Sequence, residues 1–161
     1  MVFVYDIDEN LQKSDGVRPL QPTLYFTRLA QRICSALSAP TGEGKLYEID
    51  IRLRPTGRVG PAVVQINRYF EYLRTQAWTW ELMALTRARP VAGPDDVQTK
   101  VYEGIRKTLT SITNEEKLRA DAVKMRKKMI TQQKDLSKWN IKHRIGGLVD
   151  IEFILQFLQL A

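Results

Sequence analysis

The chain has 161 residues, of which 43% are hydrophobic and 27% charged, a composition typical of a globular protein with one sizeable core. Its formal net charge of +7 favours anionic partners such as nucleotides, nucleic acids or acidic protein surfaces. No run of 18 apolar residues is present, and the single cysteine, Cys34, excludes an internal disulfide. We therefore expect a protein of the cytoplasm that does not associate with a membrane.

The first third of the chain is predicted to contain strands and a helix. An apolar strand is expected over residues 2–5, and a helix over residues 23–39, where apolar side chains recur at helical spacing. A second strand is expected over residues 45–53. Its apolar residues alternate with polar ones, so one face of this strand would carry Glu48, Asp50, Arg52 and Arg54.

The middle of the chain is predicted to be helical. A helix should begin near Ile66, and its apolar pattern extends towards Arg89, where Pro90 ends it. A further helix should open at Asp95 and Asp96, because acidic side chains favour the positive end of a helix.

Helices are also predicted for the last third of the chain. Thr113 and Glu116 have the spacing of a capping box at the start of one helix. A loop over residues 135–147 should lead to a last helix over residues 148–160. That helix is apolar on most sides, which is typical of a helix inside a larger protein. We therefore expect the chain to be a part of a longer one.

The polar face of the predicted strand over residues 45–53 is the candidate functional site. The Asp50 carboxylate could bind a metal ion, and the planar guanidinium groups of Arg52 and Arg54 could bind a polyphosphate. Gly57, in the turn that follows, would let the backbone approach a ligand closely. An exposed ion pair between Asp50 and Arg52 explains the same pattern without a ligand. The residues alone leave both interpretations open.

Basic side chains are concentrated between residues 117 and 144. A solvated helix face is the ordinary explanation, and a docking surface for an anionic partner is the alternative. Nucleic acid is not the expected partner, because exposed aromatic residues do not alternate with the basic ones. A zinc site is not expected, because the only histidine has no companion ligand at a suitable spacing. The basic residues are Lys117, Arg119, Lys124, Arg126, Lys127, Lys128, Lys134, Lys138, Lys142, His143 and Arg144.

Three motifs occur in order along the chain: RLRPTG, AWTWELMALTRAR and GGLVDIEFILQFLQL. Together with VFVYD and LYEIDIRLRPTGRVGP, they resemble the glutamine synthetase adenylyltransferase (glutamate–ammonia-ligase adenylyltransferase) family over nearly the whole chain. Members of that family carry two related nucleotidyltransferase domains, one that attaches AMP and one that removes it. The AWTWE motif resembles the attaching, C-terminal domain, because the removing domain usually reads closer to DWERYA at this place.

The resemblance implies an α+β fold similar to that of DNA polymerase β-type nucleotidyltransferases. Residues 1–93 would form a partial nucleotidyltransferase core, a small mixed sheet with helices. Residues 94–161 would form a helical region that leads into the next helical domain.

The resemblance also implies transfer of AMP from ATP to a tyrosine of glutamine synthetase, in the regulation of nitrogen assimilation. Three carboxylates of the family would bind two Mg²⁺ ions, and Asp50 matches the third of them. Arg52 and Arg54 match the basic residues after that carboxylate, and we group them with Gly57 as nucleotide-binding residues. The PII signalling protein is the family's usual effector.

The first two carboxylates of the family belong to a G-S-x-x-D-x-D type of motif that precedes VFVYD. This chain begins after that motif, so we expect it to be inactive or nearly so as it stands. The alternatives are a fragment of the AMP-removing domain, which would release AMP by phosphorolysis, and a non-catalytic piece that binds another protein.

Overall fold

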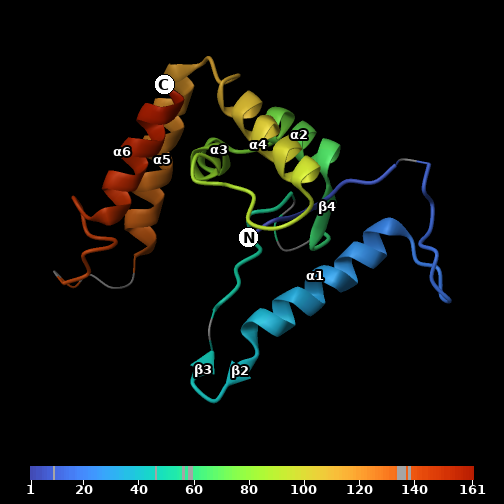
Figure 1. Cartoon of the computed structure of the whole chain (residues 1–161). Coiled ribbons are helices and arrows are strands. Elements are labelled where there is room, and N and C mark those ends of the chain that lie inside the picture. The colour runs from blue at the N-terminus through green and yellow to red at the C-terminus, as the bar shows by residue number, and fades with distance from the viewer. Residues whose placement is uncertain (9, 46, 56, 58–59, 134–136, 138) are drawn as a thin grey trace. The chain divides into compact units, whose positions relative to one another are not determined.

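A computed structural model describes residues 1–8, 10–45, 47–55, 57, 60–133, 137 and 139–161 (Figure 1). The described chain is a mixed α and β protein that divides into two compact units, residues 1–75 and residues 76–161. The boundary predicted after residue 93 separates a nucleotidyltransferase core from a helical region. It is a different division from that into compact units, and it remains a prediction. No helix of the described residues is long and apolar enough to cross a membrane.

The first unit contains a small parallel sheet. Strand β1 (Phe3–Tyr5), expected from the sequence, pairs with β4 (Val63–Gln65) in a register that places Phe3 opposite Val63. Figure 1 shows the two strands side by side. Strand β4 was not expected, because its three residues show no alternation and its partner is some 60 residues away in sequence.

Two helices pack against this sheet. Helix α1 (Pro22–Ser38) confirms the predicted helix. Proline suits its first position, because a backbone N–H in the first turn has no acceptor within the helix and proline has none to leave unpaired. Helix α2 (Ile66–Thr75) follows β4 directly, and the Gln65 side-chain oxygen accepts hydrogen bonds from the backbone N–H groups of its first turn. The buried residues of the unit come from both helices and from β4: Ala30, Val63, Ile66, Tyr69 and Leu73.

The predicted strand over residues 45–53 is wrong. A short hairpin of β2 (Pro40–Thr41) and β3 (Gly44–Lys45) ends at its first residue, and residues 47–53 form no strand; Leu46 lies outside the described residues. A strand needs a neighbour to complete its ladder of hydrogen bonds, and no described strand pairs with this segment. Side chains of the segment bond to its own backbone instead, which favours an irregular path.

The second unit is helical. The prediction of one continuous helix from Ile66 towards Arg89 is wrong. Helix α2 ends at Thr75, and a separate helix, α3, covers Thr79–Leu85. Trp78 is extended, with φ −73° and ψ 151°, and its backbone N–H donates to Glu81 Oε2 at 2.8 Å. Glu81 therefore supplies a new N-terminal cap, which the apolar spacing could not reveal.

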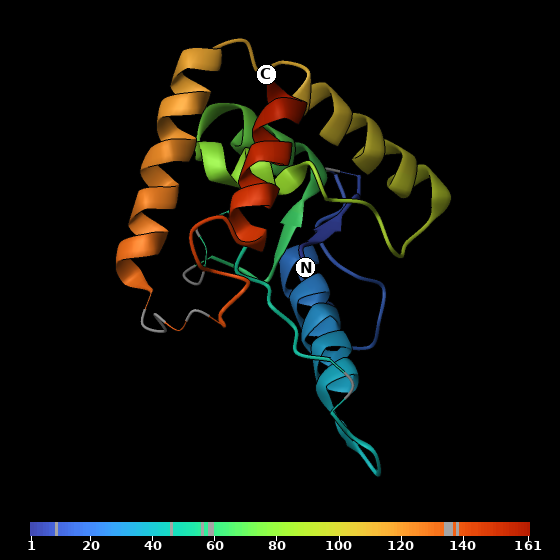
Figure 2. The same cartoon turned by 90° about the vertical axis from the view of Figure 1, so that its left-hand side faces the viewer.

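The remaining helices follow the predicted pattern closely. Helix α4 (Asp95–Leu109) begins where the sequence indicated, and α6 (Leu148–Leu160) both begins and ends where it indicated. Helix α5 (Glu115–Gln132) lies between them in sequence. Helices α5 and α6 pack side by side (Figures 1 and 2). The core of the unit consists of Met83, Leu118, Ala122 and Leu160, with Leu109, Ile112, Phe153 and Phe157 against it.

The N-terminal cap of α5 is Asn114, and not the predicted capping box of Thr113 and Glu116. Asn114 Oδ1 accepts a hydrogen bond from the Lys117 backbone N–H at 2.8 Å. Because Asn caps a helix at least as well as Thr, the helix begins one residue later than the box requires.

We expect Asn114→Ala to lower the free energy of unfolding by about 1 kcal/mol, because it leaves a helix N–H without an acceptor. Denaturant titration measures the loss, with Thr113→Ala as the matched control. A larger loss in the Thr113 variant would show that the cap has been assigned to the wrong residue.

An ion pair joins α5 to the first turn of α6, and the same arginine contacts the turn before it. Arg126 Nε donates to Asp150 Oδ1, and Arg126 Nη2 donates to the backbone carbonyl oxygens of His143 at 3.1 Å and Arg144 at 3.4 Å. Asp150 Oδ2 accepts from the Gly146 N–H at 2.5 Å. The two side chains are only 11% and 23% exposed. They therefore hold this turn and the first turn of α6 against α5. Residues 135, 136 and 138 of the predicted loop lie outside the described residues.

Candidate functional site

The candidate site lies on the irregular segment between β3 and β4, within the first unit. An open surface hollow of about 520 Å³ is lined by Glu48, Ile49, Asp50, Ile51, Arg52 and Arg54. Ile49 and Ile51 were expected on the opposite face from Asp50, but the segment is not a strand, so both kinds of side chain line the hollow. The structure thus keeps the predicted polar residues together and adds two apolar ones.

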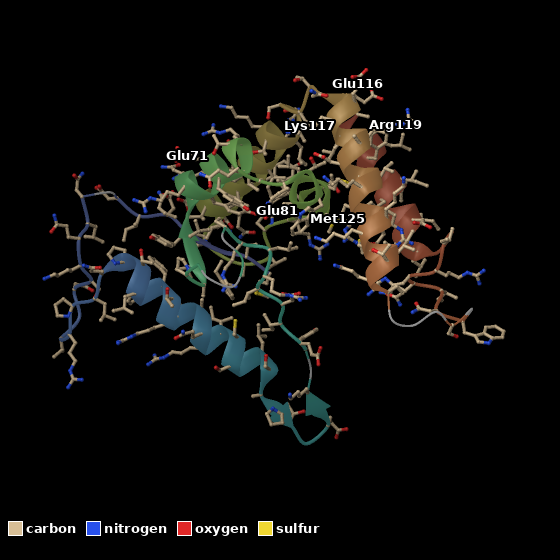
Figure 3. The ribbon with its side chains drawn as sticks, turned by 180° about the vertical axis from the view of Figure 1, so that it is seen from behind. Glu71, Glu81, Glu116, Lys117, Arg119 and Met125 are labelled. Carbon is tan, nitrogen blue, oxygen red and sulfur yellow. The ribbon has the colours of Figure 1, made fainter. Side chains whose placement is uncertain are left out.

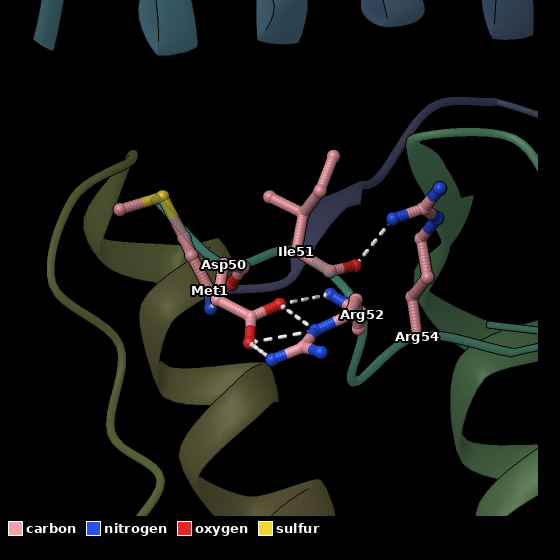
Figure 4. Close-up of polar contacts among 5 residues, drawn as sticks. All are labelled: Met1, Asp50, Ile51, Arg52 and Arg54. Carbon is pink, nitrogen blue, oxygen red and sulfur yellow. Dashed lines mark hydrogen bonds and ion pairs between the residues drawn. The ribbon is translucent and has the colours of Figure 1, made fainter. Parts of the chain in front are cut away.

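Asp50 and Arg52 form the central contact of this hollow (Figure 4). Arg52 Nη2 lies 2.5 Å from Asp50 Oδ2, and Arg52 Nε donates to both carboxylate oxygens at 2.9 Å. The Arg52 backbone N–H also donates to Asp50 Oδ1 at 2.9 Å. Both side chains are more than half exposed. The ion pair predicted as an alternative to a ligand site is therefore present, and a polyanion could still reach the guanidinium group from solvent.

The contact shifts the pKa of both groups in the direction that favours their charged forms. Hydrogen bonds from the Arg52 side chain and then from its backbone hold the pKa of Asp50 far below its usual value. The same hydrogen bond raises the pKa of the Arg52 guanidinium. Asp50 thus stays ionised well below neutral pH, and the ionised form is the one that binds a metal.

Arg54 does not join the ion pair. Its Nη1 donates to the Ile51 carbonyl oxygen, and its Nη2 donates to the Gly60 carbonyl oxygen at 3.4 Å. Its Nε is buried and finds no acceptor among the described residues. A buried N–H without a partner is costly, so this atom is the strongest indication of a missing acceptor at the site.

Gly57 closes the turn after Arg54. Its N–H donates to the Arg54 carbonyl oxygen at 2.9 Å, and its φ of 56° is one that residues other than glycine rarely adopt. Gly57 therefore shapes the turn that carries Arg54. Thr56, Arg58 and Val59 of the same predicted loop lie outside the described residues.

The residues present do not by themselves fit a two-metal site. Both oxygens of Asp50 are engaged by Arg52, and within the described ranges no three His, Cys, Asp or Glu side chains gather closely enough to hold a metal ion. Asp50 could serve as one ligand of an ion only if further carboxylates joined it and Arg52 turned towards another anion. The charged groups in the hollow suit an anion, because two guanidinium groups accompany the Asp50 carboxylate.

The other candidates from the sequence lie elsewhere. Cys34 is a free, partly buried cysteine of α1. The backbone carbonyl of His143 accepts from Arg126, so this residue belongs to the turn before α6. Lys134 and Lys138 of the basic stretch lie outside the described residues.

Comparison with known proteins gives consistent results along the chain. The family model for glutamate-ammonia ligase adenylyltransferase matches residues 1–104. Relatives described as "Bifunctional glutamine synthetase adenylyltransferase/adenylyl-removing enzyme" include those of Brucella suis, 43% identical, and Rhizobium meliloti, 44% identical, each over 161 residues and all of this chain. The relative from Agrobacterium fabrum is 41% identical over 99% of the chain.

The chain spans 16% of the length of each of these three relatives. The matched family model nevertheless covers the candidate site, both strands of the parallel sheet and helices α1 to α3. The chain belongs to the glutamate-ammonia ligase adenylyltransferase family.

Proposed function

We propose that this chain is part of an enzyme that transfers AMP from ATP to a tyrosine of glutamine synthetase. The observation that carries the proposal is the match of the whole chain to relatives named as glutamine synthetase adenylyltransferase/adenylyl-removing enzymes. The hollow around Asp50 supports it, because an anion such as a polyphosphate suits two guanidinium groups beside an open surface.

The proposal gives each site residue a role. Asp50 would be one carboxylate ligand of Mg²⁺, together with carboxylates from outside the described residues. Arg52 would release Asp50 and bind a phosphate oxygen of ATP. Arg54 would offer its Nε, which has no acceptor in the described part of the chain, to another phosphate oxygen, and Gly57 would keep the turn in place. Bound Mg²⁺ would supply charge stabilisation to the transferred phosphoryl group.

We further propose a DNA polymerase β-like nucleotidyltransferase fold for the complete domain, of which β1, β4, α1 and α2 are a part. The cytoplasm is the proposed location, since Cys34 is not in a disulfide and ATP is the substrate. The PII signalling protein is the proposed effector of the longer protein.

Removal of AMP from glutamine synthetase by phosphorolysis is the second candidate, because the relatives' names carry both activities. Attachment is preferred on the AWTWE motif at residues 77–81, which resembles the attaching domain. Release of labelled AMP from modified glutamine synthetase by a longer version of this domain, with no transfer from ATP, would favour removal instead.

Calorimetric titration of Mg²⁺-ATP tests the nucleotide site. A version extended upstream to include the family's two other carboxylates should bind, and Asp50→Asn in that version should weaken binding at least about tenfold, or 1.4 kcal/mol. Asp15→Asn, an exposed acid in the same unit, is the matched control and should bind as the unsubstituted protein does. Equal affinity in the Asp50 and Asp15 variants would remove Asp50 from the site.

A transfer assay tests the expected inactivity of this chain as it stands. We expect no labelling of glutamine synthetase above background by the 161-residue chain with ATP and Mg²⁺, because its described residues lack a metal-binding cluster. Labelling by the 161-residue chain that disappears in Asp50→Asn would overturn that expectation while supporting the site.

A further inference from the structure

Four lysines share one face of α5, and we call Lys117, Lys124, Lys127 and Lys128 the lysine face. All four are exposed. At 100° per residue they fall within an arc of about 100° and extend over about 16 Å of the helix. Met125 lies outside this arc, partly buried beside Ala122, while Lys117 lies near the N-terminal end of α5 (Figure 3). The face is therefore a compact cationic surface on a rigid helix.

Helix stability does not explain this arrangement. Lys124 and Lys128 are four residues apart, and like charges at that spacing destabilise a helix. Lys117 stands in the first turn, where the helix dipole disfavours a cation. The other three lie before the last turn, which contains no basic residue, so they gain little from the negative helix end. Asp121, four residues after Lys117 and three before Lys124, offsets part of this cost, so the clustering adds little to the stability of α5.

Neighbouring groups do not neutralise the lysine face. Within the described part of the chain, none of its four ammonium groups makes an ion pair. Glu116 lies at one edge of the arc, and Asp121 lies at the other, where it accepts a hydrogen bond from Thr79 Oγ1 at 2.5 Å. The lysines therefore keep their full charge towards solvent.

We propose that the lysine face docks an acidic surface of the protein substrate. The proposal rests on the proposed function, which requires a protein partner. Clustered exposed lysines steer an acidic partner and raise its association rate. Nucleic acid suits the face less well. No aromatic side chain lies between its lysines to stack on bases, and no arginine lies there to form bidentate hydrogen bonds with phosphates. The docking contact would use residues other than those of the proposed nucleotide site.

Binding of this chain to immobilised glutamine synthetase tests the proposal at several salt concentrations. The face variant is Lys124→Gln, Lys127→Gln and Lys128→Gln combined. The matched control is Lys13→Gln, Lys107→Gln and Lys142→Gln combined, which lowers the net charge equally at exposed positions elsewhere. Circular dichroism and thermal unfolding verify that both variants fold. Duplex DNA, single-stranded RNA and vesicles of anionic lipid are probed in parallel.

We expect the face variant to associate about tenfold more slowly than the unsubstituted chain and with a weaker dependence on salt. The association rate of the control variant should change by less than about threefold. Equal losses in both variants would show that only net charge matters and would overturn the docking face, while leaving the proposed function in place. Tighter binding to a nucleic acid or to vesicles than to glutamine synthetase would overturn the choice of partner. Absence of binding by every version would contradict the docking face and also count against the proposed substrate.

Discussion

Met83→Ala is expected to lower the free energy of unfolding by about 2–5 kcal/mol. Met83 is only 1% exposed and belongs to the core that joins α3, α5 and α6 through Leu118, Ala122 and Leu160. Removing most of its side chain leaves a cavity among three helices, which cannot all move inwards to fill it. Denaturant titration followed by circular dichroism measures the loss.

Two controls separate burial from residue type. Met83→Leu keeps most of the volume and should lose less than about 1.5 kcal/mol. Leu158→Ala, at a residue that is 64% exposed, should stay within about 0.5 kcal/mol of the unsubstituted protein. A loss in Leu158→Ala as large as that in Met83→Ala would mean that the outer side of α6 is also packed, which contradicts the core described here.

Arg126→Met is expected to lower the free energy of unfolding by about 2–4 kcal/mol. Methionine keeps much of the apolar volume but leaves the Asp150 carboxylate and the carbonyl oxygens of His143 and Arg144 without their shared donor. Arg119→Met replaces an exposed arginine of the same helix and should change stability little. Equal losses in the two variants would show that the ion pair does not hold α6.

The same ion pair predicts a dependence on pH. The hydrogen bond from Arg126 holds the pKa of Asp150 below its ordinary value of 3.8. The folded state therefore binds this proton less readily than the unfolded state, so the contribution is complete above about pH 4 to 5 and is lost as the pH falls further. The difference in unfolding free energy between the unsubstituted protein and Asp150→Asn should accordingly shrink on acidification below pH 4. A difference that is constant down to pH 2.5 would exclude this linkage.

At the candidate site, the sequence predicted which polar side chains lie close together but not the conformation of their segment. Alternation over residues 47–54 grouped Asp50, Arg52 and Arg54 correctly, because residues close in sequence stay close in either conformation. It predicted a strand wrongly, because a strand depends on a partner that the alternation does not contain. The sequence also offered the ion pair of Asp50 with Arg52 as an alternative to a ligand site, and that ion pair is present. The burial of Arg54 Nε could be found only from the tertiary structure.

The sequence by itself determined the elements whose signals are local. Helices α1 and α6 begin and end within about two residues of their predicted bounds, and α4 begins at its predicted residue, since apolar spacing, proline and acidic first turns act within a few residues. Its motifs also led to the family that the comparisons establish. The pairing of β1 with β4 could be found only from the tertiary structure. It depends on which distant segments meet, and that outcome follows from packing rather than from a local pattern.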